Sequence, residues 1–191
     1  MRRGAKQATP QLRVIGGQWR GRKLQFPDRP GLRPTGDRIR ETLFNWLGPH
    51  LHNANCLDLF AGSGALGIEA LSRGAAHCDF VDADREAITT VGRHLNTLDA
   101  TEYSTTSCDI AAHYLRQTHD TWDIVFVDPP FDARLGESTL TLLANTDRLA
   151  EASRVYFETS RSQPEPVPEG LYDVLREKTT GDVCYRLLSP R

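Results

Sequence analysis

The stretch Asp128-Pro129-Pro130-Phe131 contains residue types that can hold a planar aromatic amine. It follows a short apolar run, residues 122–127, which has the composition of a buried strand. Two prolines fix φ and remove backbone donors, so the chain after this strand should form a stiff corner that presents acceptors. Asp128 and the Pro129 carbonyl can accept the two hydrogens of an exocyclic amine, and Phe131 can stack on a base. These four residues are the predicted catalytic set.

An aryl amine needs such acceptors because its lone pair is delocalised into the ring and is a poor nucleophile. Hydrogen bonds to fixed acceptors favour localising that lone pair toward an electrophilic methyl, which permits in-line displacement without a metal or a covalent intermediate. A base inside a helix cannot reach the corner, so it must come from a loop or be flipped out. The alternative is a simple turn with a buried phenylalanine.

A glycine-rich loop lies upstream, in Cys56-Leu-Asp-Leu-Phe-Ala-Gly62-Ser-Gly64-Ala-Leu-Gly67. A strand that runs through G-x-G-x-x-G into a helix is typical of nucleotide binding, because the backbone turns tightly and the helix start offers free amides. The negative charge of Asp58 would repel the phosphates of a dinucleotide, whereas it would attract a cationic sulfonium ligand. Asp58 could instead only hold the loop amides.

Acids at the ends of two further predicted strands complete the cofactor site. Asp82 ends the second strand, where a carboxylate can accept hydrogen bonds from both ribose hydroxyls. Asp84 is the alternative carboxylate for the ribose, but it could instead cap the next helix. Asp109 could contact an adenine amino group or cap a helix. The predicted cofactor-binding residues are Asp58, Phe60, Gly62, Gly64, Asp82, Asp109 and Asp128.

Apolar runs alternate with amphipathic runs from residue 55 onward, which indicates βα units on a mostly parallel sheet. Strands are expected at 55–60, 77–82, 103–108, 122–128, 153–158, 172–177 and 182–188, and helices at 65–73, 85–98, 110–117 and 135–146. A further helix from Thr35 should end at Gly48-Pro49. The last two strands are joined by Lys178–Gly181 alone, which requires an antiparallel hairpin.

Basic residues are concentrated at the N-terminus. Residues 1–40 contain eleven Lys or Arg against two acids, whereas the whole chain has a formal charge of -2. The run 12–26 predicts a small hairpin with projecting arginines, and a polyanion would be steered to this end. A solvated basic tail is the alternative. The predicted RNA-binding residues are Arg13, Arg20, Arg22, Lys23, Arg33 and Arg38.

Length and composition narrow the class of protein. A chain of 191 residues suits one domain, and no stretch approaches the roughly 18 apolar residues of a membrane span. We therefore expect no membrane partner and a cytoplasmic location. The dispersed cysteines, Cys56, Cys78, Cys108 and Cys184, should be buried free thiols rather than a zinc or disulfide framework, and no metal site is expected.

With these residues in place, the chain resembles the RsmD family, bacterial enzymes that methylate N2 of one guanine in 16S ribosomal RNA. The resemblance covers nearly the whole chain from Leu12. It depends on Arg13-Val-Ile-Gly-Gly17 with Arg20-Gly-Arg-Lys-Leu24, on residues 33–47, on residues 58–67 and on Asp128-Pro-Pro-Phe131. The first two segments are specific to the family, while the last two recur across amino-methyltransferases. One departure is Asp82, where many relatives carry Glu.

The resemblance implies an α/β fold of the class I S-adenosylmethionine-dependent methyltransferase type (Rossmann-like). Its sheet would be seven-stranded and mostly parallel with an antiparallel last strand, plus a small N-terminal β-hairpin extension. It implies S-adenosyl-L-methionine as donor, S-adenosyl-L-homocysteine as product, and 16S rRNA in an assembled or late-assembly small ribosomal subunit as substrate. We expect a monomer divided into a disordered basic tail (1–11), an RNA-binding hairpin (12–34) and a methyltransferase domain (35–191).

Three other functions are weighed against this one. A DNA or RNA adenine-N6 methyltransferase could use the same corner, but a DNA enzyme usually has an extra target-recognition region that this length cannot supply. A NAD-dependent oxidoreductase would have no use for Asp128-Pro-Pro-Phe131. A catalytically silent RNA-binding module would keep the basic arm without the corner, whereas this chain has both.

Overall fold

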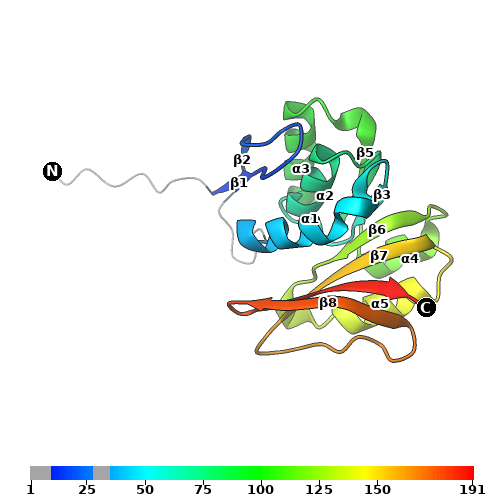
Figure 1. Ribbon diagram of the computed structural model, residues 1–191. Helices are drawn as coiled ribbons and strands as arrows, with labels where there is room; N and C mark the ends of the chain where they lie inside the picture. The colour runs from blue at the N-terminus through cyan, green and yellow to red at the C-terminus, as the bar shows by residue number, and fades with distance from the viewer. Residues whose placement is uncertain (1–9, 28–34) are drawn as a thin grey trace.

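The computed structural model describes residues 10–27 and 35–191 and contains one large sheet and one small one (Figure 1). The large sheet has seven strands in the order β5-β4-β3-β6-β7-β9-β8. Their bounds are β3 Asn55–Asp58, β4 His77–Asp82, β5 Ser104–Cys108, β6 Trp122–Val127, β7 Leu149–Ser160, β8 Tyr172–Thr180 and β9 Val183–Pro190. Strands β3 to β7 pair in parallel, and β9 pairs antiparallel with both β7 and β8. The predicted fold class, with its reversed last strand, is confirmed.

Helices cover both faces of the sheet and make three layers. The helices are α1 Asp37–Leu51, α2 Ala65–Ser72, α3 Arg85–Thr97, α4 Ala111–Gln117 and α5 Gly136–Ala144, with 3-10 turns η1 Thr101–Tyr103 and η2 Phe131–Ala133. Buried side chains of α1, α2 and α3 share one core cluster with one face of the strands. Those of α4 and α5 share a second cluster with the opposite face. This sandwich explains why the central strands are apolar on both faces.

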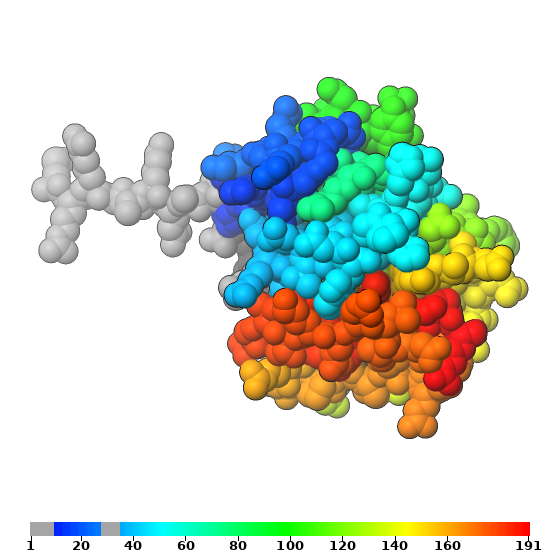
Figure 2. Space-filling model, viewed as in Figure 1, coloured from blue at the N-terminus to red at the C-terminus, as the bar shows by residue number. Residues whose placement is uncertain are grey.

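The small sheet is the N-terminal hairpin, β1 Gln11–Arg13 and β2 Lys23–Gln25, which pair antiparallel with Arg13 opposite Lys23. Its alternate residues Leu12 and Leu24 are buried in the same core cluster as α1, α2 and α3. Figure 2 shows the hairpin packed against the body of the molecule beside α1. The hairpin is therefore part of the fold rather than a loose arm. The division at residues 11 and 34 stays a prediction, because residues 1–9 and 28–34 lie outside the described part of the chain.

Three local expectations were wrong. Helix α1 does not end at Gly48 but continues to Leu51 with Pro49 inside it. Pro49 cannot donate a helix hydrogen bond, and burial of Leu51 (3% exposed) favours continuing the helix in spite of that cost. Strand β7 begins at Leu149 rather than Ser153, across a register irregularity. Cys108 is exposed because β5 is the edge strand, whereas the other three cysteines are buried free thiols.

In the described part of the chain, no helix is long and apolar enough to cross a membrane.

Candidate functional site

The two predicted motifs meet at the point where the strand order of the sheet reverses. The glycine loop follows β3 and the Asp128 corner follows β6, and these two strands are parallel neighbours. From β3 the chain continues to β4 on one side, while β6 and β7 lie on the other. Ligands of open α/β sheets bind at the carboxyl ends of the strands at such a switch point. The sheet therefore brings the predicted catalytic and cofactor residues together.

Backbone geometry shapes the glycine loop. Gly62 and Gly64 have φ of 51° and 80°, in the left-handed region that favours glycine. Gly64 is the N-cap of α2 and provides no side-chain cap. At Gly67 a Cβ would lie 2.3 Å from Cε1 of Phe80, so only glycine lets α2 pack this closely against β4. Gly62 and Gly64 thus have the turn role that the sequence indicated, and Gly67 has a packing role that it did not.

Asp58 is buried beneath this loop and binds it. Its Oδ2 accepts the Gly67 amide at 3.0 Å, inside the first turn of α2. Burial raises the pKa of Asp58 to about 7; the Gly67 amide opposes the rise, and the nearby charges of Asp128 and Asp82 add to it. The structure therefore contains the contact proposed as the alternative role, a carboxylate that holds the loop amides.

We expect Asp58 to make the fold less stable as the pH rises. Its folded pKa of about 7 lies above the usual 3.8, so between these values the folded state binds a proton that the unfolded state has lost. This contribution to the free energy of unfolding is complete below about pH 4 and is lost as the pH passes through about 7. Urea unfolding across this range should show the stability of the wild type falling relative to Asp58→Asn. A difference between the two proteins that stays constant across this range would contradict the assignment.

Asp82 also bonds the loop from the end of β4. Its Oδ2 accepts the Gly62 amide at 2.8 Å and its Oδ1 accepts the Asp84 amide at 2.8 Å. Asp84 is the N-cap of α3, where its carboxylate accepts the Glu86 amide. The capping role considered for Asp84 is confirmed. Asp82 remains the carboxylate at the carboxyl end of β4, beside the glycine loop.

Asp109 has local partners at the start of α4. Its Oδ1 accepts the amide of Ile110 at 2.8 Å, and its Oδ2 lies 2.6 Å from Nδ1 of His113. These contacts are with the N-cap residue Ile110 and with His113, and α4 has no side-chain cap, so the capping alternative considered for Asp109 is not observed. An adenine contact at Asp109 remains a prediction.

The corner after β6 continues into the 3-10 turn η2. Pro129 is buried, Pro130 is exposed and Phe131 is partly exposed at the start of η2. The Pro130 carbonyl accepts the Ala133 amide at 3.0 Å. Asp128 Oδ2 accepts a hydrogen bond of 3.0 Å from the hydroxyl of Thr35, which lies just before α1. Among the described residues, this pattern leaves the Pro129 carbonyl and Asp128 Oδ1 as acceptors at the corner.

A second buried carboxylate, Glu158, stands beside Asp128 and was missed from the sequence. Val127 of β6 pairs with Phe157 of β7, so the next residues along these parallel strands, Asp128 and Glu158, lie side by side. Glu158 is 4% exposed, and its Oε2 accepts the hydroxyl of Tyr156 at 2.5 Å. Burial raises the pKa of Glu158 well above its usual range, and the charge of Asp128 raises it further.

Burial also raises the pKa of Asp128 to about 6, although the Thr35 hydroxyl opposes the rise. Glu158 is buried and Asp128 is half-buried, so the two neighbouring carboxyls cannot both ionise without a large electrostatic cost, and the pair favours holding a proton. The sequence signal that could have found Glu158 is its place at the end of the apolar run after β6. Its meaning required the strand register.

The predicted RNA-binding residues that the structure describes lie on and beside the hairpin. Arg13, Arg20, Lys23 and Arg38 are exposed. Arg22 is exposed too, and its Nη2 donates to the Thr97 carbonyl at 3.2 Å, which ties the hairpin to the end of α3. Arg33 lies outside the described residues. The exposed residues of this set, which we call the basic surface, are distributed over β1, β2, the loop between them and the start of α1.

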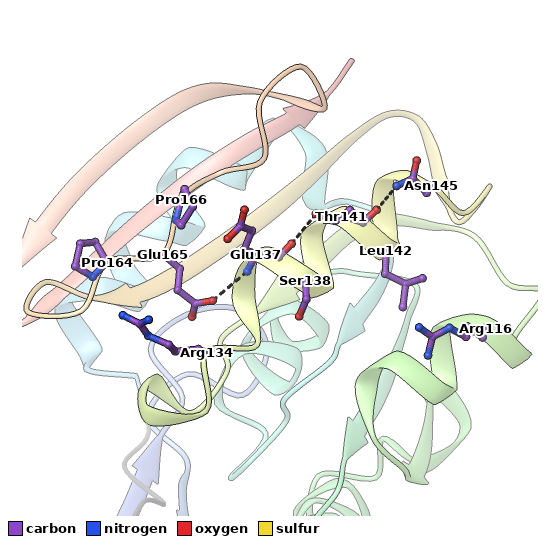
Figure 3. Close-up of a pocket in the computed structure, with 10 residues that line it drawn as sticks. All are labelled: Arg116, Arg134, Glu137, Ser138, Thr141, Leu142, Asn145, Pro164, Glu165 and Pro166. Carbon is purple, nitrogen blue, oxygen red and sulfur yellow. Dashed lines mark hydrogen bonds between the residues drawn. The ribbon is translucent and has the colours of Figure 1, made fainter.

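A separate cavity of about 640 Å³ lies along α5 beneath the loop that contains Glu165 (Figure 3). Glu165 Oε2 accepts the Glu137 amide at 3.1 Å and so caps the start of α5. None of the sequence-predicted site residues lines this cavity. The candidate site is the switch point, not this groove.

Comparisons with known proteins agree with this reading. Ribosomal RNA small subunit methyltransferase D of Escherichia coli K12 is 46% identical over 187 residues, which cover 98% of this chain and 94% of that protein. A solved structure described as a putative methyltransferase from Escherichia coli superposes with a TM-score of 0.87 at 44% identity, over 95% of this chain and 99% of the other.

A putative S-adenosylmethionine-dependent methyltransferase from Streptococcus mutans shares the fold alone. Its TM-score is 0.73 at 15% identity, over 96% of this chain and 56% of that one. The family model described as Conserved hypothetical protein 95 matches residues 12–189. This chain therefore belongs to the Conserved hypothetical protein 95 family, which is the RsmD family that its motifs resemble.

Proposed function

We propose that this protein transfers a methyl group from S-adenosylmethionine to the exocyclic N2 amine of one guanine in small-subunit (16S) ribosomal RNA. The observation that carries the proposal is the stiff acceptor corner, Asp128 to Phe131, which follows the strand next to the glycine loop. The names of the similar proteins support ribosomal RNA as the substrate class.

The residues at the switch point fit the proposed donor. Asp82 and Asp128, with Asp58 when it is ionised, give the site the negative character that suits a sulfonium and an amino group. Ser63, within the loop, has a buried hydroxyl without a hydrogen-bond partner in the described structure, which a bound ligand could satisfy. In this assignment Asp82 holds the ribose hydroxyls, and Phe60, Gly62 and Gly64 form the wall of the site.

The residues of the corner would orient and activate the amine. When bound, S-adenosylmethionine supplies an electrophilic methyl group. Asp128 Oδ1 and the Pro129 carbonyl accept the two amine hydrogens, and Thr35 keeps the Asp128 carboxylate from rotating. Phe131 stacks on the extruded base, which stabilises it by about 1–3 kcal/mol. After transfer the amine carries an extra proton, and Asp128, with a pKa raised to about 6, is placed to accept it.

The basic surface on the hairpin would bind the RNA backbone. We expect reversal of Arg20, Arg22 and Lys23 to glutamate to weaken RNA binding and to lower the salt slope of log K by about 2–3, since each lost phosphate contact removes about 0.7–0.9. The measurement is a salt titration of binding to small-subunit RNA. Reversal of Arg176 and Lys178, exposed on β8, is the control and should leave the slope unchanged. Equal slopes in all three proteins would move the RNA surface elsewhere.

The test of the proposed function is transfer of labelled methyl to small subunits from a strain that lacks the activity, followed by nucleoside analysis. N2-methylguanosine is expected. N6-methyladenosine would favour the adenine enzyme, and no transfer with bound RNA would favour a silent binding module. Parallel reactions with naked 16S rRNA test the expectation that assembled or late-assembly subunits are the substrate.

A further inference from the structure

His94 connects the glycine loop to the N-terminal hairpin. It lies in the last turn of α3 and is 4% exposed. Its Nδ1 lies 3.1 Å from the carbonyl oxygen of Ser63, in the glycine loop. Its Nε2 lies 2.9 Å from the carbonyl oxygen of Gln25, in β2. One buried ring thus bridges the proposed donor site and the basic hairpin.

Both partners of the ring are acceptors. A carbonyl oxygen cannot donate a hydrogen bond, so both ring nitrogens must carry a proton for both bonds to exist. A neutral imidazole has a single N–H and would satisfy only one of the two oxygens. The bridge is therefore complete only in the imidazolium form.

The charges on the surrounding elements do not supply another partner. The hairpin contributes Arg22 and Lys23, and α3 contributes Arg93, whose Nη2 donates to Thr90. The loop side contributes Asp82, whose carboxylate is bonded to the Gly62 and Asp84 amides. Within the described residues, no carboxylate is hydrogen-bonded or paired to the His94 ring. Within the described residues, the ring nitrogens are therefore bonded to these two backbone oxygens.

We propose that His94 is a positioning residue whose doubly protonated ring ties the glycine loop to the hairpin and so fixes the donor site relative to the RNA-binding surface. Loss of one proton breaks one of the two links. The part of this inference that concerns the donor and RNA rests on the proposed function. The bridge itself does not.

The protonation state can be observed directly in the wild-type protein. Nitrogen-15 NMR of the histidine rings, recorded at about pH 6, should show a proton on both nitrogens of His94, because each nitrogen faces a carbonyl acceptor. A His94 ring with one unprotonated nitrogen at about pH 6 would overturn the proposal.

Two amide variants separate the two links. The side-chain nitrogen of asparagine occupies the place of Nδ1 and that of glutamine the place of Nε2, and neither titrates. His94→Asn should keep donor affinity within about twofold of the wild type but lose amide-exchange protection in β1 and β2. His94→Gln should do the reverse, with donor binding about tenfold weaker, as expected for one lost charged hydrogen bond. His94→Leu should lose both.

The outcomes distinguish this inference from the proposed function. If His94→Asn and His94→Leu weaken donor binding equally, the loop link is wrong. If all variants and the wild type fail to bind S-adenosylmethionine, the proposed function fails, while the ring nitrogens and hairpin exchange still decide the bridge.

Discussion

Replacing Asp128 with asparagine is expected to slow methyl transfer at least about a hundredfold without preventing folding or donor binding. Asparagine keeps the size of the side chain, but it replaces a charged acceptor with an amide and cannot take up the proton released by the amine. Loss of one group that stabilises a transition state typically costs a factor of about 100 to 1,000 in turnover. The measurement is single-turnover transfer of labelled methyl at saturating donor and RNA.

The control for this variant is Asp132→Asn. Asp132 is exposed in η2, four residues after Asp128, so it tests whether any charge change near the corner is harmful. We expect its turnover to stay within about twofold of the wild type, as for surface substitutions away from the chemistry. Near-normal transfer by Asp128→Asn would remove the corner from the mechanism.

Replacing Glu69 with alanine is expected to lower the free energy of unfolding by about 3–5 kcal/mol, the usual cost of removing one partner from a buried ion pair. Glu69 is fully buried in α2. Its carboxylate accepts the Ile15 and Gly16 amides of the hairpin loop at 2.8 and 2.7 Å. It also pairs with Arg73 at 2.6 Å and Arg40 at 3.3 Å. All of these donors lose their acceptor in the variant.

Thermal and urea unfolding measure this effect, and the melting temperature should fall by on the order of 10 °C in a chain of this size. Glu41→Ala is the matched control, because Glu41 is exposed on α1, and it should change stability by less than about 0.5 kcal/mol. A loss below about 1 kcal/mol in Glu69→Ala would show that the hairpin does not depend on this carboxylate.

Most of the fold could be predicted from local sequence patterns. The alternation of apolar and amphipathic runs predicted the parallel strands and their helices, and the short connection at residues 178–181 predicted the final hairpin. The glycine loop and the corner after β6 lie where their sequence context indicated. Such features are encoded within ten to fifteen consecutive residues, so they can be read without knowing the register.

Contacts between distant segments could not be predicted in this way. Glu158 joins Asp128 only through the register of β6 and β7, and His94 meets Gln25 across 69 positions of sequence. The carboxylate of Glu69 joins α2 to a loop more than fifty residues earlier. Pro49 was misjudged because a local rule for helix ends was outweighed by burial of Leu51. These are long-range effects of packing on residues whose types alone say little.

The most direct test of the proposed mechanism is a crystal structure with S-adenosylhomocysteine and a guanosine-containing RNA fragment. That structure would show how the donor lies relative to the corner. We predict that the sulfur lies over the Gly62–Gly64 turn and faces the guanine N2 amine, with that amine bonded to Asp128 and to the Pro129 carbonyl. A sulfur directed away from Asp128, or a base bound elsewhere with the corner closed, would contradict the account.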